Sequence, residues 1–186
     1  MIHPAPNSRR PRWSRIILFA ILTVSLGWSQ QRESLTTVIL VRHGEKDSIG
    51  VDPKLTERGL ERARALDRIL SNVDISALYV TQYARTQQTA EMVALRHHLK
   101  PTVSDADLSH PKHIADLLVK NILEQHTGQT ILVVNHSNVI PYMLKALGAD
   151  PTELQGNITY DELFIVTRNT HGATRLLVLR YGNPSP

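Results

Sequence analysis

Two short apolar runs that end in the same way constrain what this chain can fold into. Val38–Val41 and Thr130–Val134 are continuous and rich in β-branched residues, a pattern typical of strands buried on both faces of a sheet. Each run ends abruptly in a polar segment that contains a histidine, His43 after the first run and His136 after the second. A sheet buried on both faces needs helices on either side of it, so these runs favour an α/β fold.

The segments around these runs supply the helices and the remaining strands. Thr56 can cap a helix in which apolar residues recur at helical spacing from Leu60 to Leu70, while its charged residues between Glu57 and Arg68 are expected to form a solvated face. Further helices are predicted at Tyr83–Leu95, Ile114–Leu123 and Ile140–Leu147. Further strands are predicted at Ala77–Thr81, Thr102–Val103, Leu163–Thr167 and Thr174–Leu179. This alternation predicts an α/β sandwich in which loops at the carboxyl ends of strands gather into one site.

The first 29 residues differ in character from the rest of the chain. Met1–Arg15 is basic and is followed by the apolar run Ile16–Gly27, which is the order found in signal peptides. The run is shorter than the ~20 residues that a membrane-spanning helix needs. We therefore expect cleavage near Gly27–Ser29 and export to the periplasm or the extracellular space, with an uncleaved membrane anchor as the alternative. The predicted parts are a signal peptide or anchor at 1–29, a linker at 30–36, a domain at 37–182 and a tail at 183–186.

Composition excludes several classes of function. The formal net charge of +4 comes from the N-terminal residues, where arginines accumulate and no acid precedes Glu33, so the remaining chain is close to neutral and no nucleic-acid partner is expected. The absence of cysteine excludes disulfides, thiolate zinc sites and a cysteine nucleophile. His97-His98 and His110-x-x-His113 have no carboxylate in ligand register. We expect neither a metal nor another cofactor.

The two histidine-containing strand ends and the start of the second helix suit phosphoryl transfer. Arg42 and Gly44 flank His43, so a guanidinium and an accessible backbone lie beside the imidazole. Arg85 begins a helix directly after a strand, where backbone amides favour an anion. With His136 at a matching strand end, fixed cations and imidazoles could surround one phosphoryl group, and a neutral His43 could attack its phosphorus.

Four motifs in order resemble the histidine phosphatase superfamily, also called phosphoglycerate mutase-like. The motifs are Arg42-His43-Gly44, Leu55-Thr56-x-x-Gly59, the Arg-Thr-x-x-Thr-Ala segment Arg85–Ala90, and His136-Ser137. The resemblance covers about Thr37 to Tyr181. It implies a compact single-domain member whose fold is a three-layer α/β/α sandwich with a mainly parallel central sheet.

The resemblance also implies roles for individual residues. His43 is the expected phosphorylated nucleophile, and Arg42, Arg85 and His136 complete the expected phosphate pocket. Ser137 and Asn138, which follow His136, are further candidates for binding phosphate because both carry hydrogen-bond donors.

The proton donor for the leaving group is left open by the sequence. In the family this acid usually lies in the segment after the second helix, where this chain has Asp105 and Asp107 without the usual surrounding pattern. Glu45, two residues from His43, is a third candidate, and a surface or salt-bridge role for it is equally compatible with the sequence.

These observations predict an exported, metal-independent phosphatase that acts through a phosphohistidine on His43. The expected substrate is a phosphorylated small molecule or a phosphoprotein side chain, and the membrane would be contacted only through an uncleaved N-terminal segment. A non-catalytic phosphate-binding domain of the same fold is the alternative, and a phosphoglycerate mutase is less expected because the short chain leaves little room for lid insertions. The small size resembles the family's compact phosphohistidine phosphatases, whose cytoplasmic location conflicts with this N-terminus.

Overall fold

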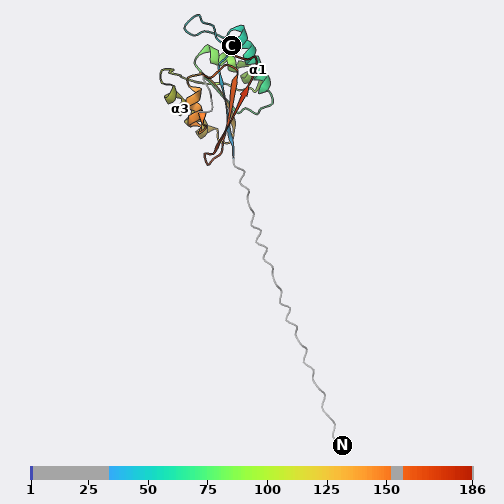
Figure 1. Cartoon of the computed structure of the whole chain (residues 1–186). Helices are drawn as coiled ribbons and strands as arrows, with labels where there is room; N and C mark the ends of the chain where they lie inside the picture. Colours follow the sequence, from blue (N-terminus) through green and yellow to red (C-terminus); the bar gives the residue numbers. More distant parts are fainter. Residues whose placement is uncertain (2–33, 152–156, 186) are drawn as a thin grey trace. The chain divides into compact units, whose positions relative to one another are not determined.

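The computed structural model of this chain describes Met1 and residues 34–151 and 157–185 (Figure 1). Apart from Met1, the predicted signal peptide or anchor at 1–29 therefore lies outside the described residues, as does most of the predicted linker. Residues Arg32–Pro186 cluster as one compact unit. Within the described ranges, no helix is long and apolar enough to cross a membrane.

A six-stranded sheet forms the centre of this unit, with the strand order β3-β2-β4-β1-β5-β6. The strands are β1 (Thr36–Arg42), β2 (Ala77–Thr81), β3 (Thr102–Ser104), β4 (Thr130–Asn135), β5 (Glu162–Arg168) and β6 (Thr174–Arg180). The first four strands pair in parallel, while β5 is antiparallel to β1 and β6 is antiparallel to β5. In the β1–β4 pair, Arg42 lies opposite Asn135, so the two histidine-containing segments leave the same edge of the sheet.

Helices cover both faces of the sheet, and Figure 1 shows α1 and α3 on opposite sides of it. The helices are α1 (Glu57–Ile69), α2 (Ala84–Arg96), α3 (Pro111–Gln125) and α4 (Ile140–Ala146). Alternate residues of β1 enter different cores: Val38 and Leu40 pack with α3 and α4, while Ile39 and Val41 pack with α1 and α2. This alternation is what a strand buried on both faces requires.

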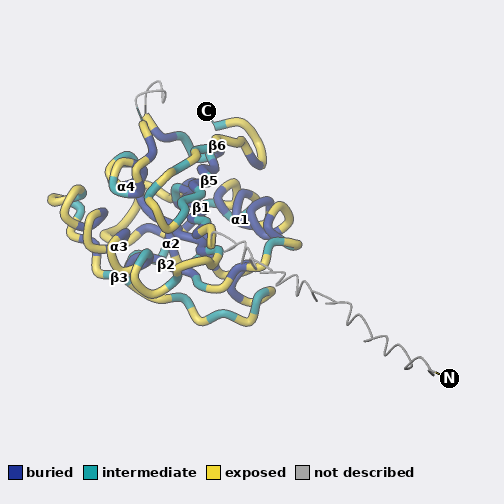
Figure 2. The backbone as a smooth tube through the Cα atoms, turned by 90° about the horizontal axis from the view of Figure 1, so that it is seen from below, coloured by how far each residue is buried: buried dark blue, intermediate teal, exposed yellow. Residues whose placement is uncertain are grey.

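The predicted fold class, a three-layer sandwich with a mainly parallel sheet, is confirmed. Every predicted helix and strand is present, with bounds that differ by a few residues. The predicted N-cap of α1 is also present, because the Thr56 side chain accepts a hydrogen bond from the Gly59 amide. Figure 2 shows α1 alternating between buried and exposed colours along its turns, as expected of a helix that packs by one side.

Candidate active site

The loop that follows β1 presents His43 with a defined tautomer. The His43 amide donates to the Asn135 carbonyl oxygen at 3.0 Å, which extends the β1–β4 pairing by one step. The His43 Nδ1 atom lies 2.8 Å from the Gly44 carbonyl oxygen, which can only accept, so Nδ1 carries the ring proton. The lone pair of the neutral ring is therefore on Nε2, so Nε2 is the ring nitrogen that could act as a nucleophile.

The surroundings of His43 keep its ring neutral. The residue is 4% exposed, and burial is the main cause that lowers its pKa to about 4. The charges of Arg85, Arg42 and Lys46 contribute to this lowering, while the hydrogen bond to Gly44 opposes it. At neutral pH the imidazole is unprotonated and able to attack.

Two glycines allow the loop that carries His43 and the start of α1 to touch. A Cβ atom on Gly59 would lie 2.2 Å from the Glu45 carbonyl oxygen, and one on Gly44 would lie 2.9 Å from the Gly59 carbonyl oxygen. The same Glu45 oxygen accepts from the Thr56 amide at 2.9 Å. The first two sequence motifs are thus one packed unit in which neither glycine can gain a side chain without movement of the backbone.

The third motif packs against the same loop. The Thr89 hydroxyl accepts from the Gly44 amide at 2.9 Å and donates to the Arg85 carbonyl oxygen at 2.7 Å. Because a buried hydroxyl links the two backbones, the first turn of α2 is held at a fixed distance from the loop that carries His43.

Arg42 and Arg85 both stack on tyrosine rings. The Arg42 guanidinium carbon lies 3.8 Å from the centroid of the Tyr160 ring, and that of Arg85 lies 4.2 Å from the centroid of the Tyr83 ring. The Nε atoms of both arginines are buried and have no hydrogen-bond partner among the described residues. Stacking fixes the guanidinium planes and leaves N–H donors for an anion.

Each of these arginines also has a fixed polar anchor. Arg42 Nη1 donates to the Ile158 carbonyl oxygen at 2.9 Å. Arg85 Nη1 lies 3.6 Å from Asp52 Oδ1, and the Asp52 carboxylate also accepts from the Ala84 amide at the start of α2. Asp52 therefore caps α2 and orients its first arginine.

His136 faces His43 across the sheet edge. The two ring centroids are 5.3 Å apart, and the rings meet edge to face. Burial, together with the charges of His43, Arg85 and Arg42, lowers the pKa of His136 to about 3. Its Nε2 lies 3.1 Å from the buried Thr81 hydroxyl at the end of β2, which orients the ring.

The predicted phosphate ligands Ser137 and Asn138 lie where β4 leads into α4. Ser137 is half-buried, whereas Asn138 is exposed and donates from its Nδ2 atom to the Leu108 carbonyl oxygen at 3.2 Å. Asn138 thus holds the segment after β3 beside the pocket, and its amide is already occupied in this arrangement.

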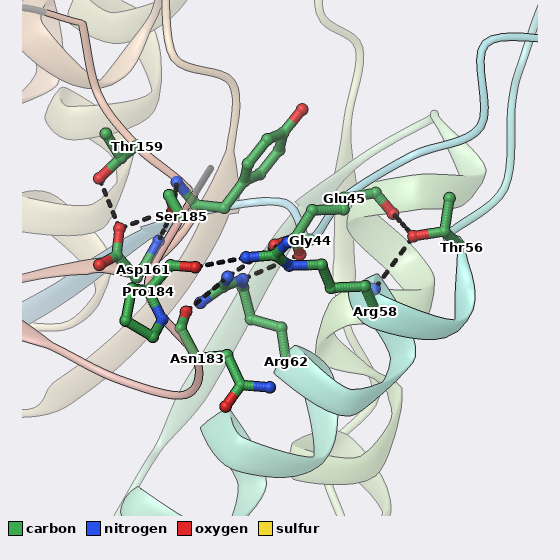
Figure 3. Close-up of polar contacts among 12 residues, drawn as sticks. Gly44, Glu45, Thr56, Arg58, Arg62, Thr159, Asp161, Asn183, Pro184 and Ser185 are labelled. Atoms are coloured by element: carbon green, nitrogen blue, oxygen red, sulfur yellow. Dashed lines mark hydrogen bonds and ion pairs between the residues drawn. The ribbon is translucent and has the colours of Figure 1, made fainter.

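Glu45 is an anchor in this structure and is not placed to donate a proton. Its carboxylate accepts from Arg62 through two contacts, Nη2 to Oε1 at 2.6 Å and Nε to Oε2 at 2.9 Å, and Arg58 Nε lies 3.2 Å from Oε1 (Figure 3). Burial opposes ionisation of Glu45, but its hydrogen bonds and the two positive charges lower its pKa below the ordinary value. An ionised carboxylate held by two guanidinium groups has no proton to give.

The two aspartates after β3 differ in their surroundings. Asp107 accepts from Ser109 and from His110 Nδ1, the latter at 2.7 Å, and these hydrogen bonds lower its pKa to about 2. Asp107 is therefore a turn-stabilising carboxylate that stays ionised. Asp105 is exposed, and its neighbour Ala106 is fixed to the Gln82 side chain by two hydrogen bonds, so Asp105 remains beside the β2–α2 loop.

Several residues of the site escaped sequence reasoning. Arg62 was expected on the solvated face of α1 but is 2% exposed, because Glu45 and the backbone after β6 accept from its guanidinium. Tyr83, Tyr160 and Asp52 lie in loops or at a helix start, where no periodicity marks them. For Tyr83 a signal existed, since it directly precedes the Ala84-Arg85 helix start.

The described residues contain no group of three or more histidines, cysteines, aspartates or glutamates arranged to hold a metal ion. Charge in the pocket comes instead from Arg42 and Arg85. Both cations are close enough to lower the pKa of His43 and of His136, so guanidinium donors lie beside two neutral imidazoles, an arrangement that suits an anion such as phosphate.

Comparison with known proteins agrees with this geometry. A sequence model of the histidine phosphatase superfamily (branch 1) matches residues 38–109, which include the first three motifs. A protein from Schizosaccharomyces pombe named as a probable phosphatase is 23% identical over 166 residues, spanning 64% of this chain and 59% of the relative. A 2,3-bisphosphoglycerate-dependent phosphoglycerate mutase from Arabidopsis thaliana is 32% identical over 79 residues, spanning 39% of this chain and 24% of the mutase.

The fold is shared with solved structures. A mycobacterial glucosyl-3-phosphoglycerate phosphatase superposes with a TM-score of 0.64 at 14% identity, over 80% of this chain and all of the other. The chain spans about 59% and 24% of the two curated relatives named above. The resemblance to the superfamily that the motifs predicted is confirmed by the family match, and the fold is confirmed by the structures.

Proposed function

Because this chain is phosphatase-like and matches the histidine phosphatase superfamily, we propose that it is a metal-independent phosphatase that works through a phosphohistidine on Nε2 of His43. The substrate is a phosphate monoester or a phosphorylated protein side chain. The observation that carries the proposal is the neutral, buried imidazole of His43, with its proton fixed on Nδ1 and with Arg42, Arg85 and His136 around it.

The reaction follows from this arrangement. The Nε2 lone pair attacks phosphorus, a P–N bond forms, and the P–O bond to the leaving group breaks, with that oxygen taking a proton from water. Arg42 and Arg85 offset the negative charge on the equatorial oxygens of the phosphoryl group. Water then attacks the phosphohistidine, which releases phosphate and restores neutral His43.

The carboxylates of the site restrict which phosphate esters are hydrolysed efficiently. Glu45 and Asp107 are both held in ionised form, whereas Asp105 is exposed and no described residue binds its carboxylate. Leaving groups that need little protonation, such as a nitrophenolate, should therefore react best.

We also propose that the domain acts after export. The support is the basic Met1–Arg15 segment followed by the apolar Ile16–Gly27 run. The test is to locate the chain in fractionated cells and determine the N-terminal residue of the exported form. Full-length chain retained in the cytoplasmic fraction would contradict export.

The test of the activity is hydrolysis of p-nitrophenyl phosphate by the full chain in EDTA. Wild type should turn over, and His43→Ala should lose activity by at least about a thousandfold, because the nucleophile is removed. His113→Ala, which changes an exposed histidine of α3, is the matched control and should behave as wild type. Full activity in His43→Ala would refute the mechanism.

A non-catalytic phosphate-binding domain is the second candidate. The engagement of Glu45 and Asp107 by other groups favours it, because it leaves the pocket intact while weakening acid catalysis. Phosphate binding without turnover of an activated ester would establish this alternative. A mutase would instead transfer the phosphoryl group back to its product, and product analysis would detect this.

A further inference from the structure

The segment that follows β6, residues 181–185, lies along α1 and is bound through its backbone. The Tyr181 amide donates to the Asp161 carbonyl oxygen at 2.9 Å. Arg62 donates to the carbonyl oxygens of Tyr181 and Asn183, each at 2.9 Å, and Arg58 donates to that of Pro184 (Figure 3). The 181–185 segment is therefore part of the packed domain, although the sequence placed residues 183–186 in a tail.

The same arginines hold the nucleophile loop. Arg58 and Arg62 both bind the Glu45 carboxylate, and Glu45 lies two residues after His43. The backbone of the 181–185 segment and the carboxylate of Glu45 thus share two guanidinium groups. One side of the segment is fixed to the loop that carries the nucleophile.

The other side is fixed through the Ser185 side chain. Ser185 Oγ accepts from the amides of Tyr160 and Asp161, at 2.9 and 3.1 Å, and donates to Asp161 Oδ1 at 2.7 Å (Figure 3). The Asp161 carboxylate is buried and also accepts from Thr159 and Arg180. Burial raises the pKa of Asp161, but these hydrogen bonds more than offset that effect and hold the pKa below its ordinary value.

The loop bound by Ser185 is the one that positions Arg42. Its Ile158 carbonyl oxygen accepts from Arg42 Nη1, and its Tyr160 ring lies under the Arg42 guanidinium. The Tyr160 ring centroid is also 6.0 Å from that of His43. Ser185 therefore lies two contacts from the arginine that binds phosphate.

We propose that Ser185 is a positioning residue for the phosphate pocket, acting through residues 158–161 on the guanidinium of Arg42. This inference rests on the proposed function, because it takes Arg42 as a phosphate ligand. A hydroxyl suits the position since it accepts from two amides and donates to a carboxylate at once. Alanine can do neither, whereas threonine keeps the hydroxyl.

The experiment measures binding of inorganic phosphate to the full chain by titration calorimetry, together with kcat and KM for p-nitrophenyl phosphate. Ser185→Ala should weaken phosphate binding about tenfold and raise KM similarly, because two partly buried amides lose their acceptor and the Asp161 carboxylate loses one of its donors. Ser185→Thr should stay within about twofold of wild type. Ser76→Ala, an exposed serine directly before β2, is the matched control and should match wild type.

A double-mutant cycle tests whether Ser185 acts on Arg42 through Tyr160. In a Tyr160→Ala background, Ser185→Ala should have a smaller effect on phosphate binding than in wild type, since the ring under Arg42 is already gone. If Ser185→Ala fails to fold, Asp161→Asn replaces it and should show the same loss of phosphate affinity and the same non-additivity.

The outcomes separate this inference from the proposed function. Wild type that binds phosphate while Ser185→Ala binds it equally well would overturn the positioning role and leave the phosphatase intact. Additive effects of Ser185→Ala and Tyr160→Ala would overturn the route through Tyr160. Wild type that neither binds phosphate nor hydrolyses the ester would overturn both.

Discussion

The pH dependence of this protein should differ from that of an ordinary histidine enzyme, because both site histidines are buried beside arginines. The pKa of His43 falls from 6.5 to about 4, a change of about 2.5 units that corresponds to about 3 kcal/mol. At pH 5, about nine-tenths of His43 would then be neutral, against about 3% for an unperturbed imidazole. Nucleophilic activity should persist well into the acid range.

The effect on stability has the same origin. The unfolded chain binds the proton of His43 near pH 6.5, but the folded chain binds it only near pH 4. The free energy of unfolding is therefore highest above pH 6.5 and decreases as the pH falls from 6.5 to 4, by about 3 kcal/mol for this residue alone. His136, with its pKa lowered to about 3, extends the loss to lower pH, and the neighbouring rings titrate as a coupled pair.

Two assays check the lowered histidine pKa values and the loss of stability at acid pH. Ring-carbon proton shifts of His43 and His136 should titrate below pH 5. Urea unfolding should give a lower free energy of unfolding at pH 4.5 than at pH 7. His136→Asn should make this difference smaller, because one of the two titrating groups is removed. A titration midpoint near 6.5 for His43, or equal stability at both pH values, would refute the reasoning.

Three substitutions probe the contacts around the pocket. Arg85→Lys keeps the charge but loses the planar fork stacked on Tyr83, so kcat/KM for p-nitrophenyl phosphate should fall about a hundredfold, and a change below about threefold would contradict this role. Thr81→Val keeps the side-chain shape but removes the hydroxyl at His136, and it should lower kcat/KM about tenfold without changing the thermal midpoint by more than a few degrees. Glu45→Gln leaves the buried guanidinium of Arg62 without its counter-charge, so the free energy of unfolding measured in urea should decrease by about 3 kcal/mol. A loss of activity at unchanged stability would contradict this and indicate Glu45 as the proton donor.

The sequence predicted those parts of the site that depend on strand ends. His43 and His136 each follow a continuous apolar run, and parallel strands that are neighbours in a sheet bring such residues to one edge. Arg85 could be placed because its helix begins directly after β2. The two glycine motifs were recognised separately, but their contact with each other required the structure.

The residues that the sequence did not reveal depend on contacts far apart in the chain. Arg62 lies among the charged residues of α1, and it is buried only because Glu45 and the backbone of the 181–185 segment cover it. Tyr160 lies in a loop whose backbone is fixed by Ser185, a residue in the predicted tail. Neither partner is in helical or strand register with the residue it fixes, so no local pattern could have predicted these contacts.

The measurement that tests the central claim most directly is the identification of the phosphorylated residue. The full chain is mixed with p-nitrophenyl phosphate, quenched in alkali within milliseconds and digested, and the phosphopeptides are sequenced by mass spectrometry. The account predicts an acid-labile, alkali-stable phosphoryl group on His43, which is absent in His43→Ala and retained in the control His113→Ala. A phosphoryl group on any other residue, or undiminished turnover in His43→Ala, would contradict it.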